Sequence, residues 1–512
     1  MKKLLLAVLV LGGLWLAAGY VIGNKVEDTV RAQVAGQEII PGSDLVRLDI
    51  AEYDKGLFGA DTRICLVFDR LPPDMAMLQA YSGKLCDRGE VHYGPLLFGP
   101  DGPSLGLAYA RSELDLSPLP PEIKQMVDGL FAGQPPVIGH SWYTFDGGVD
   151  LRVLVSPFRF ESPELSASLA ELRMDGRVDD PVAKVGDFFV RGRDLRVAGP
   201  QGALVLPELD AEVRLKAMLG EVLPLIDMTM AANGLSVSAG GREQVAGNVT
   251  LRTRTREDGD TLSGDSGLWL DALSGDQVPE RVDSAWLGFD WHGFDRAAAI
   301  RVQRISQELD SLQLEMMMQA MSGEGDAAAM QEKGERMAAL GEEMITVMST
   351  QLLHPERTGM TVKMVVDGAG ERQLTLDSAL DYNGLDGLNP SFAELQMLPP
   401  AALARLVDLS VDFDAASALL PPGLRAGLVD YQSSGWLRQQ DGRLRTRLTL
   451  EQGEVTLNGA SMTVEELMSK GQAAARGGVS TDLPETLDSG GYYPRCRGAH
   501  PVRLSRSGCC SW

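Results

Sequence analysis

The residues best suited to chemistry occur in short, separate stretches. Gly264-Asp265-Ser266-Gly267 matches the sequence around the nucleophile of one class of serine proteases. Such catalysis also needs a histidine that accepts the serine proton and a buried aspartate that orients the histidine. Upstream of Ser266 the chain has only His92 and His140, and neither has the Ala-Ala-His-Cys setting of those proteases. We therefore interpret the tetrapeptide as a Gly/Asp/Ser loop.

Acidic residues also crowd the stretch Glu257-Asp258-Gly259-Asp260. Their spacing differs from an EF-hand loop, whose ligands alternate and end in a glutamate, so we interpret the stretch as a solvated hairpin tip. The chain lacks the glycine-rich phosphate-binding motifs, and we find no convincing catalytic carboxylate pair. We expect a protein that is not an enzyme and has no cofactor or metal.

Methionines concentrate between residues 316 and 348. Met330, Met337 and Met344 recur every seven residues, which is a helical spacing, and we take them as candidate interaction residues. Methionine is flexible and polarizable and suits adaptable apolar surfaces. Three interpretations stay open: a helix face packed in the protein's own core, a groove for a lipid or a protein partner, and a copper site. We prefer the first.

Two of the five cysteines lie in the body of the chain, Cys65 and Cys86. In an oxidising compartment they could form a disulfide, and two unpaired buried thiols are the alternative. The other three cysteines crowd a basic, aperiodic tail after Gly490. We interpret this tail as appended or read in an altered frame. A metal site there is disfavoured because Cys509 and Cys510 are adjacent.

The longest apolar run is Leu4 to Ile22, preceded by Lys2 and Lys3. At about 1.5 Å per residue, a helix of this length spans close to the roughly 30 Å hydrocarbon core of a bilayer. A cleaved signal peptide is the competing interpretation, but its apolar part is usually shorter. We expect an uncleaved single-pass anchor with its lysines in the cytoplasm and the bulk of the chain outside.

Composition narrows the class of protein further. The net charge of −24 argues against nucleic-acid binding, which needs clustered Lys and Arg, and against docking on anionic lipid headgroups. The 44% hydrophobic content is enough for sizeable cores. An acidic ectodomain is the simplest interpretation.

Hydrophobic periodicity predicts the secondary structure. Apolar residues alternate with polar ones in many short segments up to Thr255, which is typical of antiparallel strands. From Arg296 to Leu353 the spacing changes to threes and fours, which predicts two helices joined at Gly323-Glu324-Gly325. Strands then resume, and Thr463 is expected to cap a last helix. The predicted regions are an anchor (1–23), a β-rich periplasmic region (24–290), a helical hairpin (291–355), an α+β region (356–476) and a disordered tail (477–512).

Three stretches together resemble the YdgA-type family of bacterial envelope proteins, whose function is largely undefined. They are the turn Tyr53-Asp54-Lys55-Gly56-Leu57-Phe58, the stretch Val91-His92-Tyr93-Gly94-Pro95-Leu96 and the closing Gly453-Glu454-Val455-Thr456-Leu457-Asn458-Gly459. The second departs from the family's His-Gly-Pro pattern by inserting Tyr93. The resemblance implies a Gram-negative inner-membrane anchor and a periplasmic β-rich body, and it supplies no catalytic residue.

We therefore expect an α+β protein with an N-terminal transmembrane helix and long antiparallel β-meander sheets packed with a helical hairpin. Two functions are consistent with this fold. The first is a non-enzymatic envelope scaffold that holds protein partners or self-associates. The second is a lipid- or hydrophobic-ligand-binding protein with a curved sheet groove, acting in envelope maintenance. A sheet face left apolar and uncovered would favour the second.

Overall fold

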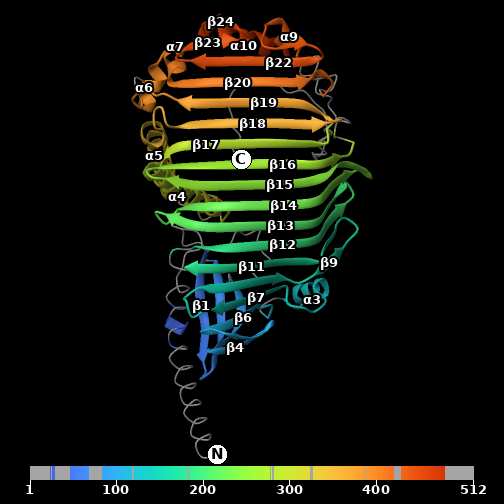
Figure 1. Cartoon of the computed structure of the whole chain (residues 1–512). Coiled ribbons are helices and arrows are strands. Elements are labelled where there is room, and N and C mark those ends of the chain that lie inside the picture. Colours follow the sequence, from blue (N-terminus) through green and yellow to red (C-terminus); the bar gives the residue numbers. More distant parts are fainter. Residues whose placement is uncertain are drawn as a thin grey trace, which may run out of the picture.

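The computed structural model describes residues 24, 26–28, 31, 46–68, 84–117, 120–180, 183, 185–276, 278, 282–322, 327–385, 387–419 and 428–478. Within these ranges one antiparallel sheet of 22 strands dominates, accompanied by a two-stranded sheet and a few helices. Figure 1 shows the strands from β11 (Glu171–Asp180) to β22 (Arg443–Glu451) lying side by side across the molecule, whereas the strands around β1 (Val46–Lys55) run more nearly along its length. The predicted anchor Leu4–Ile22 and the cysteine-rich tail lie outside the described residues. No helix in the described part is both long and apolar enough to cross a membrane.

The N-terminal part of the sheet consists of short strands joined mostly by tight turns. The hairpin β4–β5 leaves the sheet between β3 and β6 and forms the separate two-stranded sheet. Helix α3 (Pro121–Leu130) lies between β6 and β7. The strands of this part are β1 (Val46–Lys55), β2 (Gly59–Phe68), β3 (Lys84–Tyr93), β4 (Leu96–Gly99), β5 (Gly102–Leu105), β6 (Ala108–Leu114), β7 (Val137–Tyr143), β8 (Val149–Val155) and β9 (Phe158–Glu161).

The central part is a meander in which each strand from β11 to β17 pairs with the next along the chain, whereas the short strand β10 pairs with β9 and β12. Period-two patterning predicts most of them, and the structure has no parallel pair among its described strands. They are β10 (Ser166–Leu169), β11 (Glu171–Asp180), β12 (Val185–Gly199), β13 (Gly202–Leu219), β14 (Leu223–Ala239), β15 (Arg242–Asp258), β16 (Thr261–Ser274) and β17 (Ser284–Asp295).

The sequence interpretation of Gly264-Asp265-Ser266-Gly267 as a loop is wrong, because all four residues lie inside β16. The glycines make room for tryptophan rings. A Cβ at Gly264 would lie 2.6 Å from the ring of Trp291, and one at Gly267 would lie 2.3 Å from the ring of Trp269. Glycine in a strand often marks such a close approach. The acidic stretch before it does form a hairpin tip, between β15 and β16.

The helical hairpin is present as predicted and interrupts the meander. It consists of α4 (Arg296–Ser322), α5 (Ala327–Val347) and η1 (Met348–Leu352), a short π-helical turn. The sequence places the start of the helical region at residue 291, whereas residues 291–295 complete β17. The hairpin lies at one end of the strands, where α4 approaches β14 and β17 (Figure 1).

The C-terminal part resumes the same sheet and closes it with helices. The predicted cap at Thr463 is confirmed, and the structure shows that it is a capping box. Its Oγ1 accepts a hydrogen bond from the Glu466 backbone N–H at 3.1 Å, and its own N–H donates to the Glu466 carboxylate at 3.0 Å. The elements are β18 (Gly359–Gly368), β19 (Glu371–Tyr382), α6 (Phe392–Met397), α7 (Pro400–Leu403), η2 (Ala404–Leu406), β20 (Val407–Ala416), η3 (Ser417–Leu419), α9 (Val429–Ser433), β21 (Arg438–Gln440), β22 (Arg443–Glu451), β23 (Glu454–Leu457), β24 (Ala460–Met462) and α10 (Val464–Gly478).

Candidate functional site

The register of the sheet puts apolar and charged residues on opposite faces. Residues paired across antiparallel strands point to the same side, so a row of partners can be followed from strand to strand. One such row runs through eleven strands, β8 and β11 to β20, and every member is apolar. We call it the central apolar row: Val153, Met174, Val190, Ala211, Met230, Leu251, Leu268, Leu287, Met364, Leu376 and Phe413.

The face that carries this row, here called the apolar face, stays partly open to solvent. No member of the central apolar row is fully buried. Leu287 is 42% exposed and Phe289, its neighbour on the same face, is 38% exposed. A core face would bury such side chains, so the middle of this face lacks the cover that a folded domain usually gives its large hydrophobic residues.

The C-terminal end of the same face is closed. Leu448, Val455 and Leu457 on β22 and β23 form a buried cluster, with Val455 and Leu457 each 2% exposed. Trp436 and Leu467, which lies on α10, pack against this cluster. The helices therefore cover the apolar face here.

The helical hairpin has a core of its own. Ala298, Ile305, Leu340 and Val347 are buried together between α4 and α5, and Met344 packs against them. Met330 and Met337 are half-buried on the same helix. The three predicted interaction methionines therefore do not form one exposed surface. The exposed apolar side chains of the hairpin are other residues, Met317, Ile345 and Met348 among them.

The opposite face, here called the charged face, carries cross-strand ion pairs. Arg152 donates to Asp175 at 2.9 Å, and Arg214 donates to Asp187 at 2.7 Å. Burial alone would raise the pKa of the Asp175 carboxyl, but hydrogen bonds from Arg173 and Arg152 hold that pKa below its usual range. Pairs of this kind keep the face wettable and soluble.

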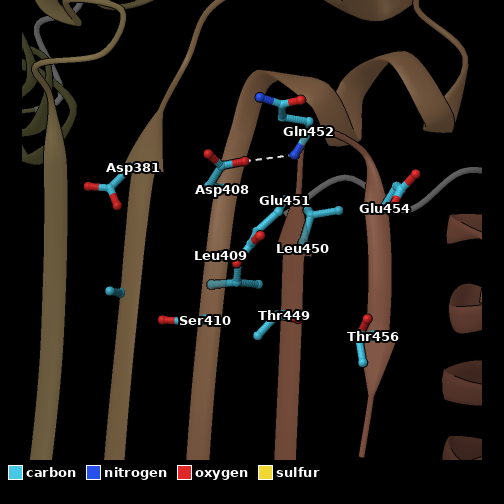
Figure 2. Close-up of a pocket in the computed structure, with 11 residues that line it drawn as sticks. Asp381, Asp408, Leu409, Ser410, Thr449, Leu450, Glu451, Gln452, Glu454 and Thr456 are labelled. Carbon is cyan, nitrogen blue, oxygen red and sulfur yellow. Dashed lines mark hydrogen bonds between the residues drawn. The ribbon is translucent and has the colours of Figure 1, made fainter. Parts of the chain in front are cut away.

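A hollow on the charged face lies near the C-terminal end, over β19, β20, β22 and β23 (Figure 2). It has a volume of about 710 Å³ and four carboxylates on its lining, Asp381, Asp408, Glu451 and Glu454. Asp408 accepts a hydrogen bond from the backbone N–H of Gln452 at 2.9 Å. Among the described residues no group of His, Cys, Asp or Glu could hold a metal ion. We see no acid–base pair in this open hollow.

The predicted cysteine pair lies in the N-terminal part of the sheet. Cys65 on β2 and Cys86 on β3 are direct cross-strand partners, and the structure links them by a buried disulfide with a Cα–Cα distance of 3.9 Å. The bond is buried and joins two neighbouring strands, so we assign it a structural role.

The apolar face itself was not identified as a site from the sequence. Its residues in β16 and β17 were missed because glycines interrupt both strands. The short apolar runs Leu268-Trp269-Leu270 and Trp286-Leu287 are the signal that could have found these strands. Whether anything covers the face could not be read from alternation at all.

Comparisons with known proteins place the chain in one family. No curated protein and no solved structure matches it significantly. One family model, described as a bacterial protein of unknown function (DUF945), matches residues 1–352. This match covers more than half of the 512 residues and includes every described strand from β1 to β17 together with the helical hairpin. The chain therefore belongs to the DUF945 family of bacterial proteins.

Proposed function

We propose that this protein binds lipid acyl chains, or ligands of the same chemistry, along the apolar face of its sheet. The observation that carries the proposal is the central apolar row, which runs unbroken across eleven strands without a fully buried member. Ten of its members are half-buried and Leu287 is exposed. A long apolar row that stays partly open to water is unfavourable and usually marks a binding surface. Acyl chains are apolar along their whole length and need no polar partner, which fits such a row.

The dimensions of the face suit long ligands. Ten successive pairings join the strands of the central apolar row from β8 to β20, and neighbouring strands lie about 4.8 Å apart, so this row extends about 48 Å. That exceeds the roughly 30 Å thickness of a bilayer's hydrocarbon core. A ligand could therefore lie lengthwise without bending.

We further propose that the protein is not an enzyme and is anchored in the inner membrane with its sheet in the periplasm. The uncharged run Leu4–Ile22 and the preceding lysines support the anchor. The resemblance to the YdgA-type envelope family supports the compartment. An exported location also agrees with the Cys65–Cys86 disulfide, because such bonds persist in oxidising compartments.

An envelope scaffold is the second candidate function. The exposed side chains Ile345 and Met348, three residues apart at the end of α5 and the start of η1, favour it, because they offer a protein partner or a second copy an apolar helical surface. On this view the apolar face would be covered by protein rather than by lipid.

Lipid analysis of the detergent-free ectodomain, beginning at Asn24, tests the first candidate. The variant Leu287→Asp/Phe289→Asp places two charges on the apolar face. Phe189→Asp is the matched control, because Phe189 is 48% exposed on the charged face. We expect lipid to accompany the wild type and the control and to be largely lost from the double variant, with all three melting at similar temperatures. A wild type that carries no lipid would reject the proposal and leave the scaffold.

A further inference from the structure

Large apolar side chains are exposed at the N-terminal end of the sheet. Leu57 and Phe58 form the turn between β1 and β2, and Phe145 lies in the turn between β7 and β8. Phe98 and Leu105 on the β4–β5 hairpin are 68% and 72% exposed, the highest values in this group. We call this group the apolar foot: Leu57, Phe58, Leu96, Phe98, Leu105 and Phe145.

Backbone hydrogen bonds show that these segments belong to one end of the sheet. The N–H of Tyr93 donates to the Phe58 carbonyl at 2.8 Å, and the N–H of Gly94 donates to the Leu107 carbonyl at 2.7 Å. The N–H of Leu107 in turn donates to the Tyr143 carbonyl at 2.7 Å, at the start of the β7–β8 turn. Figure 1 shows β4 at the lower end of the molecule, below β6 and β7.

The hairpin β4–β5 is built to present apolar groups outward. Its cross-strand pair Leu96–Leu105 and the residue Phe98 share one side, while Leu97 points to the other and is 1% exposed. A Cβ at Gly99 would lie 2.9 Å from the indole nitrogen of Trp142, so glycine lets the hairpin lie close to the sheet. The inner side is therefore fixed by packing, and the outer side is left to solvent.

Two acidic groups beside the apolar foot are neutralised by arginines. Asp101 pairs with Arg152 at 2.7 Å, and Asp146 pairs with Arg177 at 2.8 Å. Asp54 and Asp61 near the first turn stay exposed. Contact of this end with another surface must therefore be driven by apolar burial rather than by attraction to negative charge.

The position of the chain just after its first apolar run indicates what lies opposite the foot. Asn24 is hydrogen-bonded to Lys55, two residues before Leu57, and Val26 is buried against Ala60 and Val91. Ile22 ends the apolar run only two residues before Asn24. Two residues reach at most about 7 Å, so a membrane that holds the run lies within about that distance of this end of the sheet.

We propose that the apolar foot inserts into the surface of the lipid bilayer that holds the anchor. This inference rests on the proposed function and names the membrane as the surface where that function begins. Leu and Phe side chains at loop tips contribute to interfacial binding through their buried apolar area. The contact sets the sheet end-on to the bilayer, with its β1 end in contact with lipid.

Site-specific photocrosslinking in the full chain tests the proposal. The protein is reconstituted into zwitterionic phosphatidylcholine vesicles that contain a clickable phospholipid. p-Benzoylphenylalanine replaces one residue at a time: Phe98 on the foot, Leu287 on the apolar face, or Phe189 on the charged face as the exposed control. All three positions are exposed, and a thermal melt checks that each variant folds.

We expect about tenfold more lipid adduct at Phe98 than at Phe189, because burial of one large apolar side chain corresponds to at least about tenfold in affinity. Raising the salt concentration should not change the ratio, since the contact is apolar. Equal adduct at Phe98 and Phe189 would overturn the proposal. Adduct at Leu287 without adduct at Phe98 would also overturn it while supporting the proposed function. Adduct at Phe98 but none at Leu287 would support the foot and count against lipid on the apolar face.

Discussion

The middle and the C-terminal end of the sheet carry the same alternation with opposite outcomes. Leu287 and Leu457 both point to the apolar face, yet the first is 42% exposed and the second is 2% exposed. The helices that follow β22 and β23 account for the difference. The comparison shows that the same apolar face can stabilise the fold where helices bury its side chains, and can offer a binding surface where its side chains stay in contact with water.

The largest expected effect sharpens this contrast directly. Leu457→Ala should lower the free energy of unfolding by about 2–5 kcal/mol, because it leaves a cavity in a closed cluster. Leu287→Ala should cost less than about 1 kcal/mol, since much of that side chain is already in water. Urea unfolding of the two variants beside the wild type measures both. Equal losses would show that the middle is covered as well.

The second prediction extends the comparison to the N-terminal end of the sheet, where a disulfide links two neighbouring strands. Replacing Cys65 and Cys86 by alanine should destabilise the protein by about 3 kcal/mol, the value expected for a loop with a sequence separation of 21. Urea unfolding measures the loss. Alkylation of the denatured, unreduced wild type followed by intact mass is the control. Modification of both cysteines there would mean that they are unpaired thiols.

The pH dependence of this same end provides a third prediction. His140 is buried and its Nδ1 lies 2.8 Å from the Tyr109 hydroxyl. Burial, together with the charges of Arg111 and Arg152, lowers the pKa of His140 below its ordinary value of 6.5. The folded state therefore binds a proton less readily than the unfolded state. The contribution of neutral His140 to the free energy of unfolding is therefore complete above about pH 6.5 and decreases as the pH falls below that value.

The variant His140→Gln isolates that contribution. We expect the wild type to lose more stability than the variant between pH 7.5 and 5.5 when urea midpoints are compared. Parallel pH profiles for the two proteins would contradict the assignment, whatever the absolute stability of the variant.

Much of the fold could be predicted, because alternation and helical spacing are properties of local sequence. The start of α4 at Arg296 and the cap at Thr463 could both be predicted from the sequence. Strands β16 and β17 could not be predicted in the same way. Gly264 and Gly267 resemble loop residues in the sequence, and only folding brings tryptophan rings so close to them that a larger residue would not fit. The openness of the apolar face was equally hidden. Leu287 and Leu457 have similar local patterns, and only distant helices distinguish them.

The fourth prediction concerns the helical hairpin, where a buried and a half-buried side chain can be compared on the same helix. Met337→Gln should cost about 1 kcal/mol or less, because the side chain is only half-buried. Leu340→Gln, three residues away and 3% exposed, should cost several times more. Thermal melts compare the two. A large loss for Met337→Gln would favour a fully buried methionine stripe.

The smallest effect is expected on the charged face. Arg447 donates from Nε to Asp412 at 3.0 Å, but both side chains are exposed. Arg447→Gln should leave the urea midpoint unchanged within error, since exposed pairs contribute little. A clear loss of stability would mean that this cross-strand ion pair helps to hold β20 and β22 together.

The sequential pairing of the strands has a consequence for how the chain is made. From β11 to β20 each strand pairs with the next strand along the chain. Two long connections interrupt this series: the helical hairpin between β17 and β18, and the segment with α6, α7 and η2 between β19 and β20. Neighbour-by-neighbour contacts close only short loops, so strands can join the sheet in the order in which they are synthesised. Each new strand then briefly exposes an unpaired edge, and such edges aggregate. The last strands and helices complete the sheet at one end. Chains truncated before β22 should therefore aggregate through their unpaired edge strand and should not fold as shorter, stable forms of the protein.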